Sequence, residues 1–335
     1  MTQTDALIRR SFPGRALPLR AALVLAVTAL SIARVAAADA QAQATGATAS
    51  QSPTALILEP ETFTLDGARA HLQLVLTGAF AADDLRDLTH AAAFTSSDPN
   101  VAAVEKTVVR PVANGKATIT ATLAGQTAAA EITVTGLDQP APVSFKNETL
   151  AALTKAGCNQ GACHGSPSGK AGFRLSLRAF DPAVDMDTLR QEFFGRRANV
   201  MQPSESLILK KPLMEVAHGG GKRIHKGDPA WTALHDWIGE GMKLDAPSVP
   251  SLVRIALFPK KRVFRPAGDA QQLRVNGHFS DGSVRDLTAL TVFSSSSESV
   301  AGVSESGLVQ KEGRGETAIL ARYLDKMDTA ELTFL

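Results

Sequence analysis

An internal repeat limits the folds that this chain can adopt more strongly than any other feature. The segment 85–89 (LRDLT) recurs 199 positions later as 284–288 (VRDLT). Two further pairs of segments match in the same order, with one residue inserted before the second pair: 94–104 with 293–303, and 115–121 with 315–321. Order, spacing and residue type agree, so the chain contains one domain twice, on either side of an unrepeated segment.

Both copies, 55–136 and 250–335, predict β-structure. Apolar and polar residues alternate along short runs such as 117–121, and turn residues separate these runs. A period of two places alternate side chains on opposite faces of a strand, and short strands separated by turns are typical of an antiparallel sandwich. The apolar positions are expected to fill the core, and Asp87 or Asp286 to fix a turn.

The first 40 residues predict export. Arginines precede an apolar run over 21–32, and small residues around Ala38 and Ala40 follow it. This order is typical of a secretory signal peptide over 1–40, and the apolar run is short for a membrane span. A retained membrane anchor is the alternative. A linker of small and polar residues follows over 41–54.

The charge balance argues against nucleic acid as a partner. The chain has 35 Lys and Arg against 33 Asp and Glu, but five of the arginines and only two acidic residues lie within 1–40. The mature chain is therefore close to neutral, which gives no electrostatic basis for binding nucleic acid. No membrane span is expected after signal cleavage, and the expected location is the periplasm or the cell surface.

The two cysteines of the chain lie in the unrepeated segment, as Cys158 and Cys163, and His164 follows directly. Two thiols ending in Cys-His are what covalent haem attachment needs, because each sulfur can add to a vinyl group and the imidazole can bind the iron. The usual spacing has two residues between the cysteines, and here there are four. A Cys158–Cys163 disulfide and a zinc site completed by a fourth ligand are the alternatives.

The segment 143–245 around the cysteines has a helical period. Helices are expected over 147–157, 188–194 and 228–239; the last opens with Asp228 followed by proline, a helix-start signal. One helix therefore precedes the cysteines directly, and an aromatic helix closes the segment. We expect a mostly α domain between two all-β sandwiches.

The sequence resembles the N-terminal part of large exported cytochrome-like proteins abundant in planctomycetes. The motifs that carry the resemblance are AGCNQGACHG at 156–165, GFRLSL at 172–177, SLILKKP at 206–212, HGGG at 218–221 and Trp237-Ile238. It implies a cytochrome c-like domain over 143–245, with flanking bacterial immunoglobulin-like domains of group 2. In that family two uncharacterised domains follow, so this chain is expected to be the front portion of a longer protein, or a truncated gene product.

For haem c, the site residues are expected to be Cys158 and Cys163 as covalent attachment points and His164 as the proximal iron ligand. His218 is the favoured distal ligand, because the three glycines after it leave the loop free to approach a porphyrin. Met214 is its alternative. The remaining candidates in the domain are His225, His235, Met186, Met201 and Met242.

Two basic pairs, Arg196-Arg197 and Lys210-Lys211, stand out in the same segment. They are candidates for neutralising haem propionates or guiding a redox partner, and a solvated surface is the alternative.

The favoured function is therefore an exported c-type cytochrome module for electron transfer or redox sensing, without catalytic activity in this region. Its redox partner is not identified by the sequence. The alternative is a surface binding or adhesion protein that takes a glycan or protein ligand through its immunoglobulin-like domains and has a disulfide in place of haem. A third hypothesis makes this region the electron-delivery or targeting arm of a C-terminal enzyme.

Overall fold

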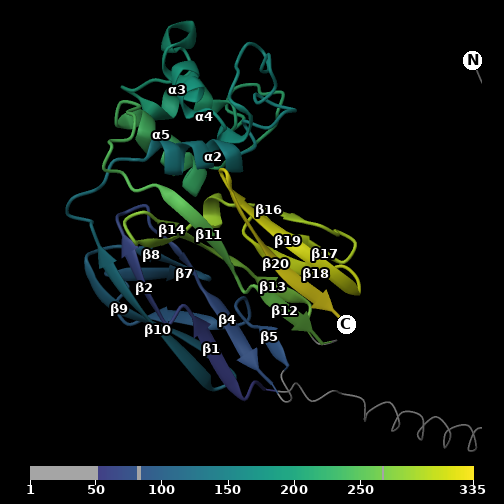
Figure 1. Cartoon of the computed structure of the whole chain (residues 1–335). Coiled ribbons are helices and arrows are strands. Elements are labelled where there is room, and N and C mark those ends of the chain that lie inside the picture. Colours follow the sequence, from purple (N-terminus) through teal and green to yellow (C-terminus); the bar gives the residue numbers. More distant parts are fainter. Residues whose placement is uncertain (1–51, 81–83, 266–267) are drawn as a thin grey trace, which may run out of the picture. The chain divides into compact units, whose positions relative to one another are not determined.

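The computed structural model describes residues 52–80, 84–265 and 268–335 (Figure 1). The predicted signal peptide over 1–40 and most of the linker over 41–54 lie outside the described residues. Within the described part of the chain, no helix combines the length and the apolar character that crossing a membrane requires.

The first repeat forms ten strands in three sheets, with strand orders β1-β4-β5, β2-β10-β9-β6 and β3-β8-β7. Its strands are β1 (Ala55–Glu59), β2 (Thr62–Asp66), β3 (Leu72–Gln73), β4 (Val75–Ala79), β5 (Leu85–Asp87), β6 (Ala93–Ser96), β7 (Ala102–Glu105), β8 (Val108–Pro111), β9 (Gly115–Leu123) and β10 (Gln126–Thr135).

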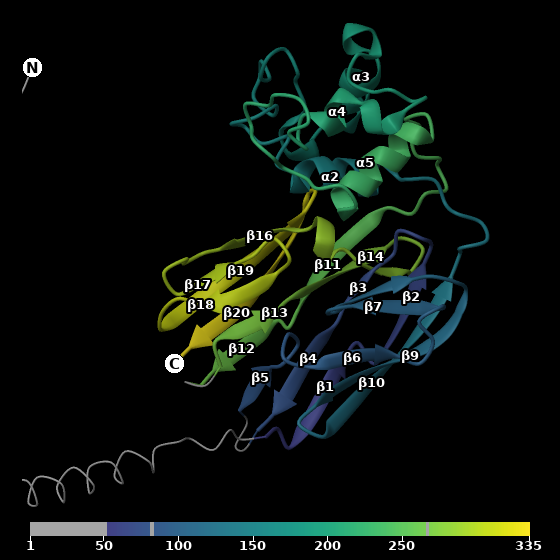
Figure 2. The same ribbon diagram turned by 180° about the vertical axis from the view of Figure 1, so that it is seen from behind.

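The second repeat has the same topology, with orders β11-β14-β15, β12-β20-β19-β16 and β13-β18-β17. Its strands are β11 (Leu252–Phe258), β12 (Lys261–Phe264), β13 (Ala270–Gln272), β14 (Arg274–Phe279), β15 (Val284–Asp286), β16 (Val292–Ser295), β17 (Ala301–Val303), β18 (Leu308–Lys311), β19 (Gly315–Tyr323) and β20 (Lys326–Phe334). Figure 2 shows both repeats from behind.

The alternation predicted from the sequence is present in the strands. Along β9, Ala117, Ile119 and Ala121 are buried, and the residues between them point away from the core. The matching strand β19 buries Ile319 and Ala321 in the same way. These apolar faces lie in the two buried clusters of the chain, one of which is confined to the first repeat.

The prediction of a purely antiparallel sandwich is wrong in one respect that both repeats share. β2 pairs in parallel with β10, and β12 pairs in parallel with β20. Pro60 and Pro259 follow β1 and β11, and a proline has no N–H with which to continue a strand ladder. The chain before each proline pairs with one sheet, and the chain after it crosses to the other.

The predicted turn at each repeated aspartate is confirmed. Oδ1 of Asp87 accepts a hydrogen bond from the Thr89 amide at 2.8 Å, and Oδ1 of Asp286 accepts one from the Thr288 amide at 2.7 Å. Each carboxylate therefore closes a local turn by accepting a hydrogen bond from the backbone amide two residues later, as aspartate commonly does.

The second oxygen of each aspartate crosses to the other repeat. Oδ2 of Asp87 accepts from the Gln272 amide at 2.9 Å, and Oδ2 of Asp286 accepts from the Gln73 amide at 2.5 Å. Because Gln73 and Gln272 are also 199 positions apart, the same bond forms in both directions. The two repeats therefore meet through a self-complementary contact, as in a two-fold dimer.

The central segment corrects the expected fold class. Its α-helices α2 (Leu150–Lys155), α3 (Pro182–Arg190), α4 (Leu207–Lys210) and α5 (Pro229–Gly239) have 6, 9, 4 and 11 residues. The remainder is loop and the short helices η1 (Phe145–Thr149), η2 (Leu177–Ala179), η3 (Glu192–Gly195) and η4 (Pro203–Glu205); η5 (Thr288–Leu290) belongs to the second repeat.

The prediction of a mostly α cytochrome c-like domain is therefore wrong, and the described chain is mostly β. The physical reason lies in the glycines after α2. A Cβ on Gly165 would meet the Asn159 carbonyl oxygen at 2.2 Å, and one on Gly169 would meet that of Phe173 at 2.2 Å. The backbone doubles back on itself at these close approaches, so most of the stretch between α2 and α3 is loop.

The three predicted helices are present with shifted ends. The first begins at Phe145, because Ser144 is the capping residue and accepts a hydrogen bond from the Asn147 amide. The last is α5, which begins at the predicted proline. The predicted helix over 188–194 corresponds to the end of α3 and the short turn η3.

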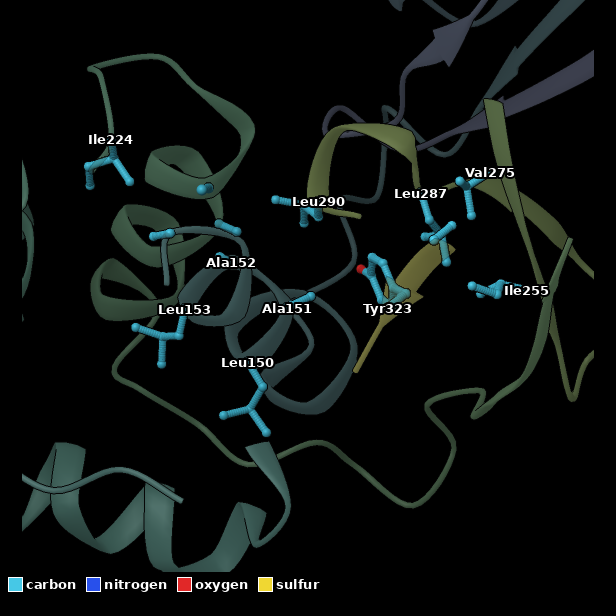
Figure 3. Packing of buried hydrophobic residues seen from close by; sticks show 14 of the residues in the cluster. Leu150, Ala151, Ala152, Leu153, Ile224, Ile255, Val275, Leu287, Leu290 and Tyr323 are labelled. Carbon is cyan, nitrogen blue, oxygen red and sulfur yellow. The ribbon is translucent and has the colours of Figure 1, made fainter. Parts of the chain in front are cut away.

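Helix α2 is anchored on the second repeat. Its residues Leu150 and Ala151 lie in one buried cluster with Leu290 and Tyr323 (Figure 3). The Tyr323 hydroxyl donates to the Asn147 carbonyl at 2.6 Å. At the other end of the helix, the Lys155 ammonium group donates to the Thr291 carbonyl at 2.7 Å and to the Glu305 carbonyl at 2.5 Å.

Replacing either repeated aspartate by asparagine is expected to lower the free energy of unfolding by about 1–3 kcal/mol, because an amide nitrogen then faces a buried backbone N–H. Urea unfolding of Asp87→Asn and Asp286→Asn measures this loss. Asp325→Asn is the control, since the Asp325 side chain is 74% exposed. Losses no larger than that of the control would contradict a structural role for the contact between repeats.

Lys155 predicts a pH dependence of stability. Burial lowers the pKa of its ammonium group from 10.5 to about 8. The unfolded chain binds the extra proton between these values, so this group makes the protein more stable as pH rises from about 8 towards 10.5. Lys155→Met should lack that increment in urea unfolding at pH 7–10, whereas exposed Lys146→Met should keep it. Parallel pH profiles for wild type and Lys155→Met would refute the assignment.

Candidate cysteine–histidine site

The end of α2 determines where the cysteines begin. Gly157 has a φ of +75°, and the Cys158 amide donates to the Leu153 carbonyl at 2.9 Å, while the Gly157 amide donates to the Thr154 carbonyl at 3.0 Å. These two bonds are a Schellman motif, in which a left-handed glycine stops the helix and satisfies its last carbonyls. Cys158 is the next residue and packs against the buried cluster.

The four residues between the cysteines form a closed loop. The His164 amide donates to the Cys158 carbonyl at 2.9 Å, and the Cys163 amide donates to the Gln160 carbonyl at 2.9 Å. Asn159 is buried, and its side-chain amide donates to the Thr154 hydroxyl at 2.8 Å. The long spacing is therefore taken up by turns, and His164 directly follows the second thiol at the rim of the loop.

Both thiols are free and partly buried. Burial raises the pKa of the Cys158 thiol to about 12. The thiolate is the species that is readily oxidised, so burial disfavours the reactive form of Cys158.

His164 is held by one residue at two points. Its Nδ1 lies 3.0 Å from the Phe173 carbonyl oxygen, and its ring centroid lies 4.5 Å from that of Phe173. A carbonyl oxygen only accepts hydrogen bonds, so Nδ1 carries the hydrogen and Nε2 keeps a free lone pair. Burial lowers the pKa of the imidazole, which favours the neutral form that binds metals.

His218 repeats this arrangement. Its Nδ1 lies 2.8 Å from the Gly221 carbonyl oxygen, which again assigns the hydrogen to Nδ1 and leaves Nε2 free. A Cβ on Gly220 would lie 2.8 Å from Cε1 of the His218 ring. The second glycine of the HGGG segment is therefore required by the position of this ring.

The structure brings the two histidines together. Their ring centroids are 6.5 Å apart and their planes differ by 12°. A metal ion bound between two imidazole nitrogens at about 2 Å each would separate the ring centroids by roughly 6 Å. The separation of the centroids alone is close to that of two imidazoles on opposite sides of one metal ion.

The other predicted ligands lie in different surroundings. Met214, the alternative to His218, is 48% exposed in the loop after α4. His225 is exposed beside Asp228, and His235 stacks on Trp231 with centroids 4.4 Å apart. Of the remaining methionines, Met186 and Met242 are buried in the core, and Met201 is exposed.

No group of three or more His, Cys, Asp or Glu side chains in the described residues is arranged to hold a metal ion. A structural zinc site needs four such ligands. Among the described residues, Cys158, Cys163 and His164 are therefore not part of a preformed zinc site.

Sequence reasoning missed Phe173, which contacts His164 through both its ring and its carbonyl group. It also missed two apolar side chains near the loop. Leu177 is 50% exposed, and its side chain would lie 3.9 Å from a Cβ added to Gly161. Phe193 is 60% exposed, and its ring would lie 3.6 Å from a Cβ added to Gly172. The GFRLSL motif contains two of these residues, but only the folded loop shows that they face the site.

No protein-family model and no curated protein matches this chain. Solved structures give weak likenesses. Domains 5–6 of the S-layer protein SbsC align over 85% of this chain and 98% of theirs, at 9% identity and a TM-score of 0.32. Domains 1–6 of SbsC align at 10% identity and a TM-score of 0.22, and this chain spans 28% of that structure. The Yersinia pseudotuberculosis adhesin InvE aligns over 86% of this chain and 61% of its own length, at 13% identity and 0.16.

Gly220→Ala is expected to displace the His218 ring, because the added methyl group would overlap it. Gly219→Ala is the matched control, since nothing lies within 4 Å of a Cβ at that position. Side-chain NMR signals of His218 and His164 should shift in Gly220→Ala and stay in place in Gly219→Ala. Equal spectra for both variants would show that Gly220 does not determine the ring position.

Proposed function

We propose that the central segment binds one haem covalently through Cys158 and Cys163, with His164 and His218 as axial ligands, and that the protein transfers single electrons outside the cytoplasm. The observation that carries the proposal is the pair of near-parallel imidazoles of His164 and His218, whose centroids are 6.5 Å apart. Each donates from Nδ1 to a backbone carbonyl, which leaves the lone pair of the neutral ring on Nε2, as in ligating histidines of metal sites.

The residues around the histidines fit a porphyrin. Both thiols are free; Cys163 directly precedes His164 in the chain, and the Cys158 carbonyl accepts a hydrogen bond from the His164 amide, so both cysteines lie close to a group bound at that imidazole. The exposed side chains of Leu177 and Phe193 supply apolar surface beside the loop, where contact with a flat apolar ring would remove them from water. The resemblance of 156–165 and 218–221 to exported cytochrome-like proteins also supports the proposal.

Attachment needs no oxidant. Each thiol adds across one vinyl double bond, so that a carbon–sulfur bond forms and the thiol hydrogen ends on the neighbouring carbon. When bound, the haem iron supplies a one-electron change between the ferrous and ferric states. His164 and His218 would be the residues that hold the iron, and two imidazoles would favour a lower reduction potential than an imidazole with a thioether. We infer no catalytic residue in this segment.

A coarser description is shared by this proposal and its alternative: an exported chain in which two β-repeats support a central segment at the cell surface or in the periplasm. In the alternative, the repeats bind a glycan or protein ligand, and Cys158 and Cys163 form a disulfide. The observation that favours it is the composition of the fold, because most of the described chain belongs to the two β-repeats and these meet through buried polar groups.

Intact mass separates the two candidates. The mature chain, expressed with a cytochrome maturation system, is expected to gain the mass of one haem and to show a Soret absorption band. The double variant Cys158→Ala, Cys163→Ala should lose the covalent adduct. A folded wild-type product without haem that is lighter by two hydrogens would instead establish the disulfide and overturn the haem proposal.

The axial ligand is tested separately. His218→Ala should remove the second imidazole and change the optical spectrum from a six-coordinate low-spin form to a five-coordinate form, whereas His225→Ala should leave the spectrum unchanged, because His225 is exposed. A spectrum that survives His218→Ala and changes in Met214→Ala would assign the ligand to Met214.

A further inference from the structure

Arg197 is more deeply enclosed than its neighbour in the basic pair. Its side chain is 11% exposed, whereas Arg196 is exposed. The guanidinium group donates to the Thr188 carbonyl at 2.9 Å and to the Gly172 carbonyl at 3.3 Å, and it pairs with the Glu192 carboxylate at 3.2 Å. Its donors are therefore directed at the protein itself, and a solvated charge does not describe it.

The flat face of the same group lies over aromatic rings. The central guanidinium carbon is 4.5 Å from the Phe173 ring centroid and 5.1 Å from that of Phe193. Arg197 thus holds Phe173 in two ways, through the ring and through the carbonyl of the preceding Gly172. A planar guanidinium can stack and donate in fixed directions at once, which a lysine cannot do.

Phe173 passes this constraint to His164. The carbonyl oxygen of Phe173 accepts from His164 Nδ1 at 3.0 Å, and its ring packs against the imidazole at 4.5 Å. If the loop at Gly172 and Phe173 shifted, both contacts would change together. Arg197, Phe173 and His164 therefore form one continuous line of contacts.

We propose that Arg197 is a positioning residue for His164, acting through Phe173 to keep the hydrogen on Nδ1 and Nε2 free. The proposal rests on the proposed function in so far as His164 is an iron ligand. A hydrogen bond from Nδ1 to a carbonyl makes the imidazole donate more electron density to the iron through Nε2. This stabilises ferric iron and lowers the reduction potential. Loss of that bond should raise the potential.

The rival explanation is that Arg197 acts only as a nearby positive charge. This explanation predicts that the reduction potential falls in Arg197→Met, because loss of a nearby positive charge stabilises ferric iron. Arg196→Met is the matched control, since it removes the same charge one residue away without touching Phe173. Arg197→Lys keeps the charge but loses the stacked planar group.

The test is the reduction potential of the haem-loaded mature chain by spectroelectrochemistry. We expect Arg197→Met and Arg197→Lys to raise the potential, and Arg196→Met to lower it slightly or leave it unchanged. An unchanged potential in Arg197→Lys, or a fall in Arg197→Met equal to that in Arg196→Met, would overturn the positioning role.

A second readout does not depend on haem. Nitrogen-15 NMR of the mature chain as purified without haem reports which ring nitrogen of His164 carries the hydrogen. Wild type and Arg196→Met should show it on Nδ1, and Arg197→Lys should show a mixture. An Nδ1 hydrogen retained in Arg197→Lys would refute the inference about Arg197, whereas failure to bind haem would refute only the proposed function.

Discussion

Two carboxylates, one in each repeat, connect the parts of this fold. Asp87 and Asp286 each have two oxygens, and each oxygen satisfies a different backbone amide: one in its own turn and one in the other repeat. A buried amide without a partner costs more free energy than an average hydrogen bond contributes. The turn and the contact between repeats therefore depend on the same side chain, and neither can be changed alone. Burial also raises the pKa of the Asp87 carboxyl, as expected for a charge held away from water.

The second repeat, in turn, determines the position of the cysteine–histidine site. Helix α2 packs on it through Leu150 and Ala151 and is bonded to it at both ends, by Tyr323 and by Lys155. Cys158 is three residues beyond Lys155, at the point where Gly157 stops the helix. The cysteine loop therefore begins at the end of a helix that is fixed on the second repeat, and the glycines within the loop determine its backbone conformation.

Local features could be predicted from the sequence, and contacts between distant segments could not. The alternation along β9, the aspartate turns and the proline start of α5 follow from neighbouring residues, and all are present. The parallel pairing of β2 with β10 was missed. Alternation of apolar and polar residues predicts which face of a strand is buried, but it does not predict which other strand pairs with it. The mostly α prediction failed because the stretches between the predicted helices are largely loop, with a close backbone approach at Gly165 that the sequence pattern does not reveal.

The spacing of the cysteines was the weakest point of the haem interpretation, and the loop explains how it can be accommodated. What attachment requires is that two thiols and the imidazole lie on one side of a short turn. The bond from the His164 amide to the Cys158 carbonyl closes that turn with four residues between the cysteines. Once the loop is closed, the position of His164 depends on Phe173, and the opposing position depends on the glycines after His218. The constraint that the structure shows at this site is therefore the closed loop that brings His164 back to Cys158.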